Sequence, residues 1–203
     1  YQYLRIAHPK LGEQVGDQLS VDTSLNREDS FLKNYKKSYT KGYKTQKAYL
    51  IKGEKLRKGE FGVLHGTMSV QKLKEVSHRY EVSINEYLVA AFIYSVYTEC
   101  LHQMPGKKPI RVAVPVNLRP FFDSVTTKNF FVMVSAEFLP EKENYSFEEV
   151  VSAAKQSLRE QITKEHLEEL FSYNVSNEKH LIARAVPLMF KNLAMRYVYT
   201  QAA

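Results

Sequence analysis

Two runs of alternating apolar residues, joined by a polar loop, constrain the fold of this 203-residue chain more than any other feature. Residues 110–117 and 130–138 both place an apolar side chain at every second position, which is typical of strands with one face in a core. The apolar positions are Ile110, Val112, Val114, Val116, Phe130, Val132, Val134, Ala136 and Phe138. The sequence therefore predicts two strands connected by loop 121–128.

Asn117 and Arg119 stand where the first of these strands leaves the core. An arginine in such a place typically holds a carboxylate or a phosphate, because its planar fork binds either group through two hydrogen bonds. A solvated charge at the end of a strand has the same spacing. The pattern alone leaves both interpretations open.

The remaining elements follow from helical periodicity and caps. Residues 61–68 alternate like a further strand, and helices are predicted over 69–81, 84–103 and 146–162, with another one after Thr163. Ser83 with Glu86, and Ser146 with Glu149, form two capping boxes. The helix from residue 84 is apolar nearly all round, so we expect it to be covered on more than one side. This order predicts an α+β or mixed α/β fold in which long helices cover one sheet.

The positive charge of the chain is concentrated in one segment. Residues 31–58 hold ten Lys or Arg and one Glu, a sum of +9, so the rest of the chain carries −2 of the net +7. Tyrosines lie between these lysines, and such a mixture can bind single-stranded nucleic acid. We favour a basic, loop-rich connector over residues 1–58, followed by a half-domain over residues 59–203, because no nucleic-acid motif accompanies the charges.

Several classes of protein are disfavoured by composition. Cys100 is the single cysteine, and no apolar run approaches the ~20 residues of a membrane span. The histidines are scattered, without the spacing of a metal site. We therefore expect a cytoplasmic protein with no metal and no membrane partner.

The strand–loop–strand region also carries a resemblance to a known family. Residues 114–120 (VPVNLRP) and 129–131 (NFF) resemble the second-half signature of the alcohol acetyltransferase-like family, within the chloramphenicol acetyltransferase / peptide-synthetase condensation-domain superfamily. The likeness extends over about residues 59–191. It implies a mixed sheet covered by long helices, and transfer of an acyl group from coenzyme A, or from a carrier-protein phosphopantetheine, to a small alcohol or amine.

In that superfamily the general base is the histidine of a His-x-x-x-Asp motif, whose aspartate is held by an arginine from the second half. Arg119 matches this arginine, but no His-x-x-x-Asp occurs in the sequence, and the expected closing strand is also missing. The resemblance thus implies a fragment whose catalytic histidine lies upstream of Tyr1. We expect these 203 residues alone to be inactive.

The resemblance implies three groups of site residues. Arg119, Asn117 and Asn129 would support the active site, His65 and Ser135 would line a substrate tunnel, and Lys107, Lys108 and Arg111 would meet the phosphates of coenzyme A. Two alternatives stay open: a catalytically inactive interaction module, and nucleic-acid binding through residues 31–58. An incomplete fold should also expose a sheet edge and apolar helix surface that favour self-association.

Overall fold

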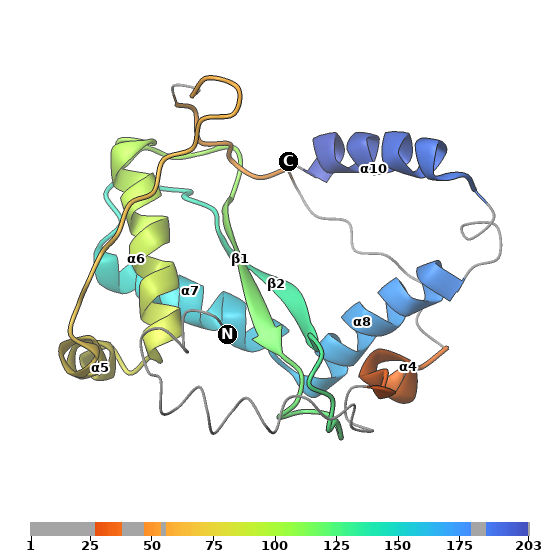
Figure 1. Ribbon diagram of the computed structural model, residues 1–203. Coiled ribbons are helices and arrows are strands. Elements are labelled where there is room, and N and C mark those ends of the chain that lie inside the picture. Colours follow the sequence, from red (N-terminus) through yellow and green to blue (C-terminus); the bar gives the residue numbers. More distant parts are fainter. Residues whose placement is uncertain (1–26, 38–46, 54–55, 180–185, 203) are drawn as a thin grey trace, which may run out of the picture.

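The structure is a computed structural model that describes residues 27–37, 47–53, 56–179 and 186–202 (Figure 1). In chain order its elements are α4 (Ser30–Asn34), α5 (Val70–Arg79), α6 (Ile84–Glu99), β1 (Ile110–Asn117), β2 (Phe131–Phe138), α7 (Phe147–Gln161), α8 (Lys164–Lys179) and α10 (Leu188–Ala202). This is an α+β arrangement, as the sequence predicts.

The two predicted strands form an antiparallel hairpin. β1 and β2 pair along their whole length, with Ile110 opposite Phe138 and Asn117 opposite Phe131. Their alternation directs one set of apolar side chains, including Val114, Val134 and Ala136, into the core. β1 runs toward the loop that joins it to β2, so this loop lies at one end of the hairpin.

Helices α6 and α7 pack against each other and against the buried face of this hairpin (Figure 1). Both predicted capping boxes are present at their N-termini, formed by Ser83 with Glu86 and by Ser146 with Glu149. In each box the serine Oγ accepts a backbone N–H, and the glutamate carboxylate accepts the N–H of the serine. The caps fix where each helix begins, and the core contacts fix which face it buries.

An ion pair links these two helices at the edge of the core. Arg159 Nε donates to Oε1 of Glu86 at 2.8 Å, and Nη2 donates to Oε2 at 3.4 Å. Glu86 is only 8% exposed. Burial alone would raise the pKa of Glu86, but the hydrogen bonds from Arg159 and from Ser83 outweigh burial and lower it. The carboxylate therefore stays ionised and joins α6 to α7.

Helix α7 also covers the outer edge of β2. The Gln161 side chain accepts from the Ser135 N–H at 3.2 Å and donates to the Ser135 carbonyl oxygen at 2.6 Å. Ser157 Oγ accepts from the Glu137 N–H at 2.9 Å. At Ser135 and Glu137 these side chains therefore occupy the positions where a third strand would pair.

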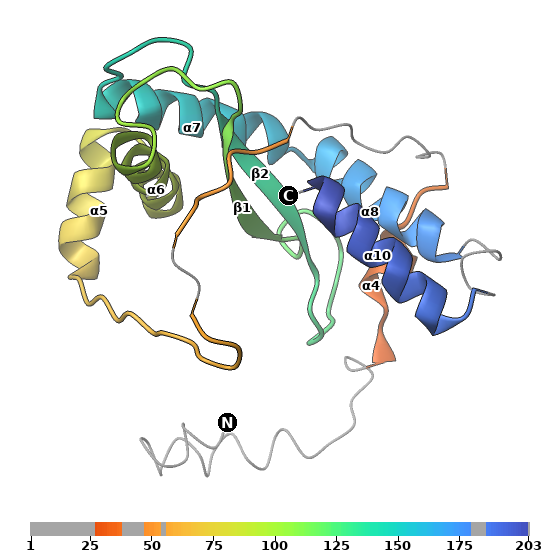
Figure 2. The ribbon, with the colours of Figure 1, turned by 90° about the horizontal axis from the view of Figure 1, so that it is seen from above.

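Helices α4 and α8 lie side by side (Figure 2), and a cluster of aromatic rings joins them to the loop end of the hairpin. Phe31 of α4 lies edge-on to Phe130, with centroids 4.9 Å apart, and 6.0 Å from Phe171 of α8. Phe122 of the loop lies 5.1 Å from Phe171. The sequence predicts a basic, loop-rich connector over this segment. Its described part around Phe31 packs on the body, because the Phe31 ring lies partly buried among these partners.

Residues 61–68, predicted to be a strand, are not one. No backbone hydrogen bond joins them to another described segment, and Phe61, Val63, Leu64 and Met68 are exposed, Phe61 by 85%. The alternation predicts which side chains would share a face, but a strand exists only where a neighbour accepts its ladder of hydrogen bonds. Within the described chain, the segment has no such neighbour.

One further prediction needs correction. The sheet is purely antiparallel and two-stranded in the described residues, rather than mixed, because only β1 and β2 pair. Helix α6 is covered on more than one side, as the sequence predicts, since it contacts α7, β1 and α5. One stripe of the helix stays exposed, where Leu88 and Phe92, one turn apart, are 40% and 52% exposed.

Helix α10 follows Pro187 directly. The proline carbonyl accepts from the N–H of Phe190, so it begins the helix. Leu188, Met189, Phe190 and Leu193 are all more than 60% exposed. Among the described residues, no helix is long and apolar enough to cross a bilayer.

Candidate functional site

Loop 117–129 is held in shape by the two residues that the sequence singled out at its start. The side-chain oxygen of Asn117 accepts from the backbone N–H of Arg119 at 3.2 Å and from its Nη1 at 3.1 Å. Arg119 Nε and Nη2 donate to the carbonyl oxygen of Thr126 at 3.2 and 3.1 Å. Nη2 also donates to the carbonyl oxygen of Lys128. The guanidinium therefore ties the start of the loop to its end.

This arrangement uses most of the hydrogen-bonding capacity of Arg119. A guanidinium has five N–H donors, and four side-chain hydrogen bonds engage all of them except one N–H on Nη1. The residue is exposed, and no described carboxylate forms an ion pair with it. The resemblance implies an arginine that holds the carboxylate of an aspartate. In the described chain it holds backbone carbonyls, and one donor is left for an outside acceptor.

Segment 28–34 supports the loop from its other side. Ser30 Oγ lies 2.6 Å from Ser124 Oγ, and Thr126 Oγ1 donates to the carbonyl oxygen of Glu28 at 3.2 Å. Lys33 bridges the two segments, with Nζ 3.3 Å from Oε2 of Glu28 and 3.1 Å from Oδ2 of Asp123. The loop is thus fixed by polar contacts from a part of the chain about 90 residues away.

The ionisable groups of this contact are tuned toward their charged forms. The hydrogen bond from Ser30, followed by that from Lys33, lowers the pKa of Glu28. The hydrogen bond to Asp123, followed by that to Glu28, raises the pKa of Lys33. Because these groups are near solvent, the shifts indicate a charged cluster rather than an acid–base catalyst.

The other predicted support and tunnel residues do not meet in one place. Asn129 is exposed and its side chain makes no hydrogen bond within the described chain. His65 lies in the exposed segment 61–68. Ser135 is half-buried in β2, and its backbone binds Gln161. Asn117 and Arg119 form a local unit, while His65 and Ser135 do not face a common described cavity.

The residues predicted to bind coenzyme A phosphates lie at the other end of β1. Lys107 and Lys108 are exposed and precede Ile110, so the eight-residue strand separates them from Arg119 by roughly 25 Å, at about 3.3 Å per residue. Arg111 forms an ion pair with Glu137 at 2.9 Å, and its Nε is buried without a partner among the described residues. The guanidinium of Arg111 is therefore committed to its neighbouring strand.

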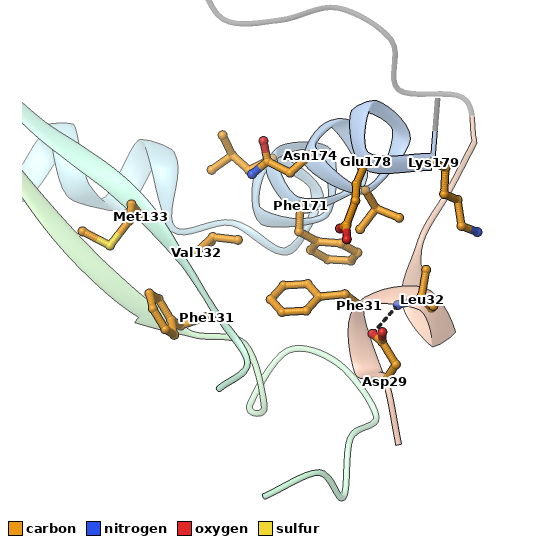
Figure 3. Close-up of a pocket in the computed structure, with 12 residues that line it drawn as sticks. Asp29, Phe31, Leu32, Phe131, Val132, Met133, Phe171, Asn174, Glu178 and Lys179 are labelled. Atoms are coloured by element: carbon orange, nitrogen blue, oxygen red, sulfur yellow. Dashed lines mark hydrogen bonds between the residues drawn. The ribbon is translucent and has the colours of Figure 1, made fainter. Parts of the chain in front are cut away.

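A cavity of about 490 Å³ lies between α4, β2 and α8 (Figure 3). Its apolar lining residues are Phe31, Leu32, Phe131, Val132, Met133, Leu170, Phe171 and Val175, and its polar ones are Asp29, Asn174, Glu178 and Lys179. This volume is in the range of small-molecule sites. The sequence did not predict this cavity, because α4 and α8 are separated by about 130 residues and no motif marks their contact.

Candidate metal ligands do not gather in the described ranges: no group of three or more His, Cys, Asp or Glu side chains is placed to hold an ion. His166 Nδ1 lies 3.8 Å from Glu169 on one face of α8, the helix-surface pair that their spacing indicated. The chemistry available at the site is therefore hydrogen bonding by Arg119 and binding in the cavity.

Comparisons with protein-family models, with curated proteins and with solved structures find no match to this chain. Its function is inferred from the residues and their geometry.

Proposed function

We propose that the chain supplies the Asn-x-Arg part of an acyltransferase that moves an acyl group from coenzyme A, or from a carrier-protein thioester, to an alcohol or amine. Loop 117–129 carries the proposal: Asn117 and Arg119 rigidify it, and one N–H on Nη1 of Arg119 is left unengaged by the described residues. That donor suits the aspartate of a His-x-x-x-Asp motif that another segment would contribute.

The arrangement around the loop supports the same proposal. Its order is β1, the Asn-x-Arg loop, β2 and then the long helix α7, which the resemblance implies. The loop does not depend on an outside carboxylate for its shape, since backbone carbonyls and segment 28–34 already hold it. A rigid loop would position the loop bearing the histidine at little entropic cost when the two meet.

In the proposed reaction, the outside histidine and Arg119 have different roles. A neutral histidine from outside this sequence would take the acceptor's proton as its oxygen or nitrogen attacks the thioester carbonyl. The new ester or amide bond forms, the carbon–sulfur bond breaks, and the thiolate leaves and is protonated. Arg119 would act as a positioning residue, since it holds the loop and does not touch the reacting atoms.

A second function, a catalytically inactive interaction module, is favoured by a separate observation. Segment 61–68 and helix α10 expose large apolar side chains, among them Phe61, Leu64 and Met189. Such surfaces mark contacts with another protein or with another part of a longer chain.

Nucleic-acid binding receives less support at two described lysines of the basic segment, Lys33 and Lys36. Lys33 is paired with Glu28 and Asp123, and Lys36 lies 2.7 Å from Glu168. These lysines already have carboxylate partners, which a phosphate would have to displace.

Release of free thiol from acetyl-coenzyme A, with a panel of small alcohols and amines as acceptors, tests the proposal. We expect no turnover above buffer from the 203 residues alone. We expect turnover from a longer polypeptide in which a His-x-x-x-Asp segment precedes them. Turnover should disappear when that histidine is replaced by alanine, and should fall when Arg119 is replaced by methionine.

Two outcomes would contradict this proposal. One is thiol release by the 203 residues alone. The other is a parent polypeptide that has no His-x-x-x-Asp and no turnover, which would favour the interaction module.

A further inference from the structure

The cavity between α4, β2 and α8 combines an aromatic floor with a carboxylate at its rim. Phe31, Phe131 and Phe171 contribute rings from three different elements. In Figure 3 the Glu178 side chain reaches down beside the Phe171 ring, while Lys179 extends to the opposite side. Rings and a carboxylate thus line the same space.

Two of the charged side chains at the rim, Lys179 and Asp29, interact with described residues, and the third, Glu178, has no ion-pair partner among them. Lys179 places its Nζ 4.5 Å from the centre of the Tyr35 ring, and Asp29 Oδ1 accepts from the Leu32 N–H as the N-cap of α4. Glu178 forms no ion pair with the described residues, although it lies one residue from Lys179. Glu178 is exposed, so the rim offers a hydrated carboxylate that is accessible to a cation.

We propose that this cavity binds an organic ammonium ion with an apolar body, such as an arylalkylamine. The face of an aromatic ring carries negative charge and attracts a cation, and Phe131, 44% exposed, is accessible to one. The Glu178 carboxylate adds a charge-assisted hydrogen bond. The apolar body fills the space above Val132, Met133 and Leu170. The volume of about 490 Å³ exceeds that of one phenyl ring and a short alkyl chain, so such a ligand fits.

Ligands of other charge fit this lining less well. A carboxylate ligand would face Glu178 and Asp29 with like charge. A purely apolar ligand would gain nothing from the Glu178 carboxylate. The inference rests on the cavity alone, and it holds whether or not the chain belongs to an acyltransferase.

Isothermal titration calorimetry of the 203-residue chain at pH 7.5 tests the site with three probes that share one body: 4-phenylbutylamine, 4-phenylbutan-1-ol and 4-phenylbutyrate. We expect saturable binding of the amine, binding of the alcohol about tenfold weaker, and no binding of the carboxylate.

Three variants locate the site. Glu178→Gln should bring amine binding down to the level of the alcohol. Asn174→Trp should abolish binding of both, because this exposed residue of α8 lies at the cavity and a larger ring there would fill it. Glu165→Gln is the matched control: it removes the same charge from the same helix, outside the cavity, and should bind the amine like the unaltered chain. Circular dichroism would show that each variant is folded.

Equal affinity for amine and alcohol, or unaltered amine binding in Glu178→Gln, would overturn the proposal. Absence of saturable amine binding would overturn it as well.

Discussion

Residues 110–117 and 61–68 were both predicted to be strands, and only the first forms one. The first segment is β1, which pairs with β2 residue by residue and buries Val114 and Val116. The second is extended and unpaired in the described chain, and its Val63 is 61% exposed. An alternating pattern therefore predicts which side chains can share a face. Whether that face is buried depends on whether a neighbouring strand pairs with the segment.

The same contrast separates helix α7 from helix α10. Helix α7 buries Val150, Ala154 and Leu158 against α6 and the hairpin, and its side chains cover the edge of β2. Helix α10 is at least as rich in large apolar residues, yet Met189 is 83% exposed. A helix rich in apolar residues buries them only where another apolar surface of the protein packs against it.

Proline substitutions in segments 110–117 and 61–68 test the first comparison, and one of them should have the largest effect on stability. Val114→Pro removes the N–H that β1 directs to β2 and should destabilise the chain by ~3 kcal/mol or more, or prevent folding. Val63→Pro should leave the melting temperature nearly unchanged, since no backbone hydrogen bond is lost there. Thermal unfolding followed by circular dichroism measures both. Equal destabilisation by the two would mean that 61–68 is paired in solution.

The dependence of stability on acid pH would measure how much the ion pair between Glu86 and Arg159 contributes at the edge of the core. Because the pKa of Glu86 lies below its ordinary value of 4.5, its contribution to stability is complete above pH 4.5. The contribution is lost as the pH falls through the lowered value. Glu86→Gln should cost about 1–3 kcal/mol at pH 7 and flatten the loss of stability in acid, since Arg159 and the cap lose a charged partner.

Glu99→Gln is the control for this measurement, because Glu99 is exposed on the same helix. Its effect should stay within about 0.5 kcal/mol. Urea unfolding between pH 3 and pH 7 gives both curves. A Glu86→Gln variant with the same acid dependence as the unaltered chain would contradict the assignment to Glu86.

The smallest effect on stability is expected for a substitution in loop 117–129. Arg119→Met removes four hydrogen bonds at an exposed position and should lower global stability by only about 1 kcal/mol. Local opening should be more evident, as faster amide exchange between Thr126 and Lys128. Arg57→Met, at another exposed arginine, should change neither measurement. Unaltered exchange in Arg119→Met would show that segment 28–34 alone holds the loop.

Some features of the site followed directly from the sequence. Asn117 and Arg119 were singled out by their place at the end of a strand, and the structure joins them to one loop. The sequence did not indicate that the acceptors would be the carbonyls of Thr126 and Lys128. A backbone carbonyl belongs to every residue, so sequence alone carries no sign of which carbonyl a guanidinium will meet.

The sequence by itself determined the local structure of this protein: the alternation of β1 and β2, and the serine caps that begin α6 and α7. These depend on residues within a few positions of one another, which the sequence displays directly. Only the tertiary structure decided that Phe31 packs on Phe171, that the cavity lies beside them, and that 61–68 remains bare. Such outcomes depend on whether a distant surface is present to pair or pack, and a local pattern carries no information about that surface.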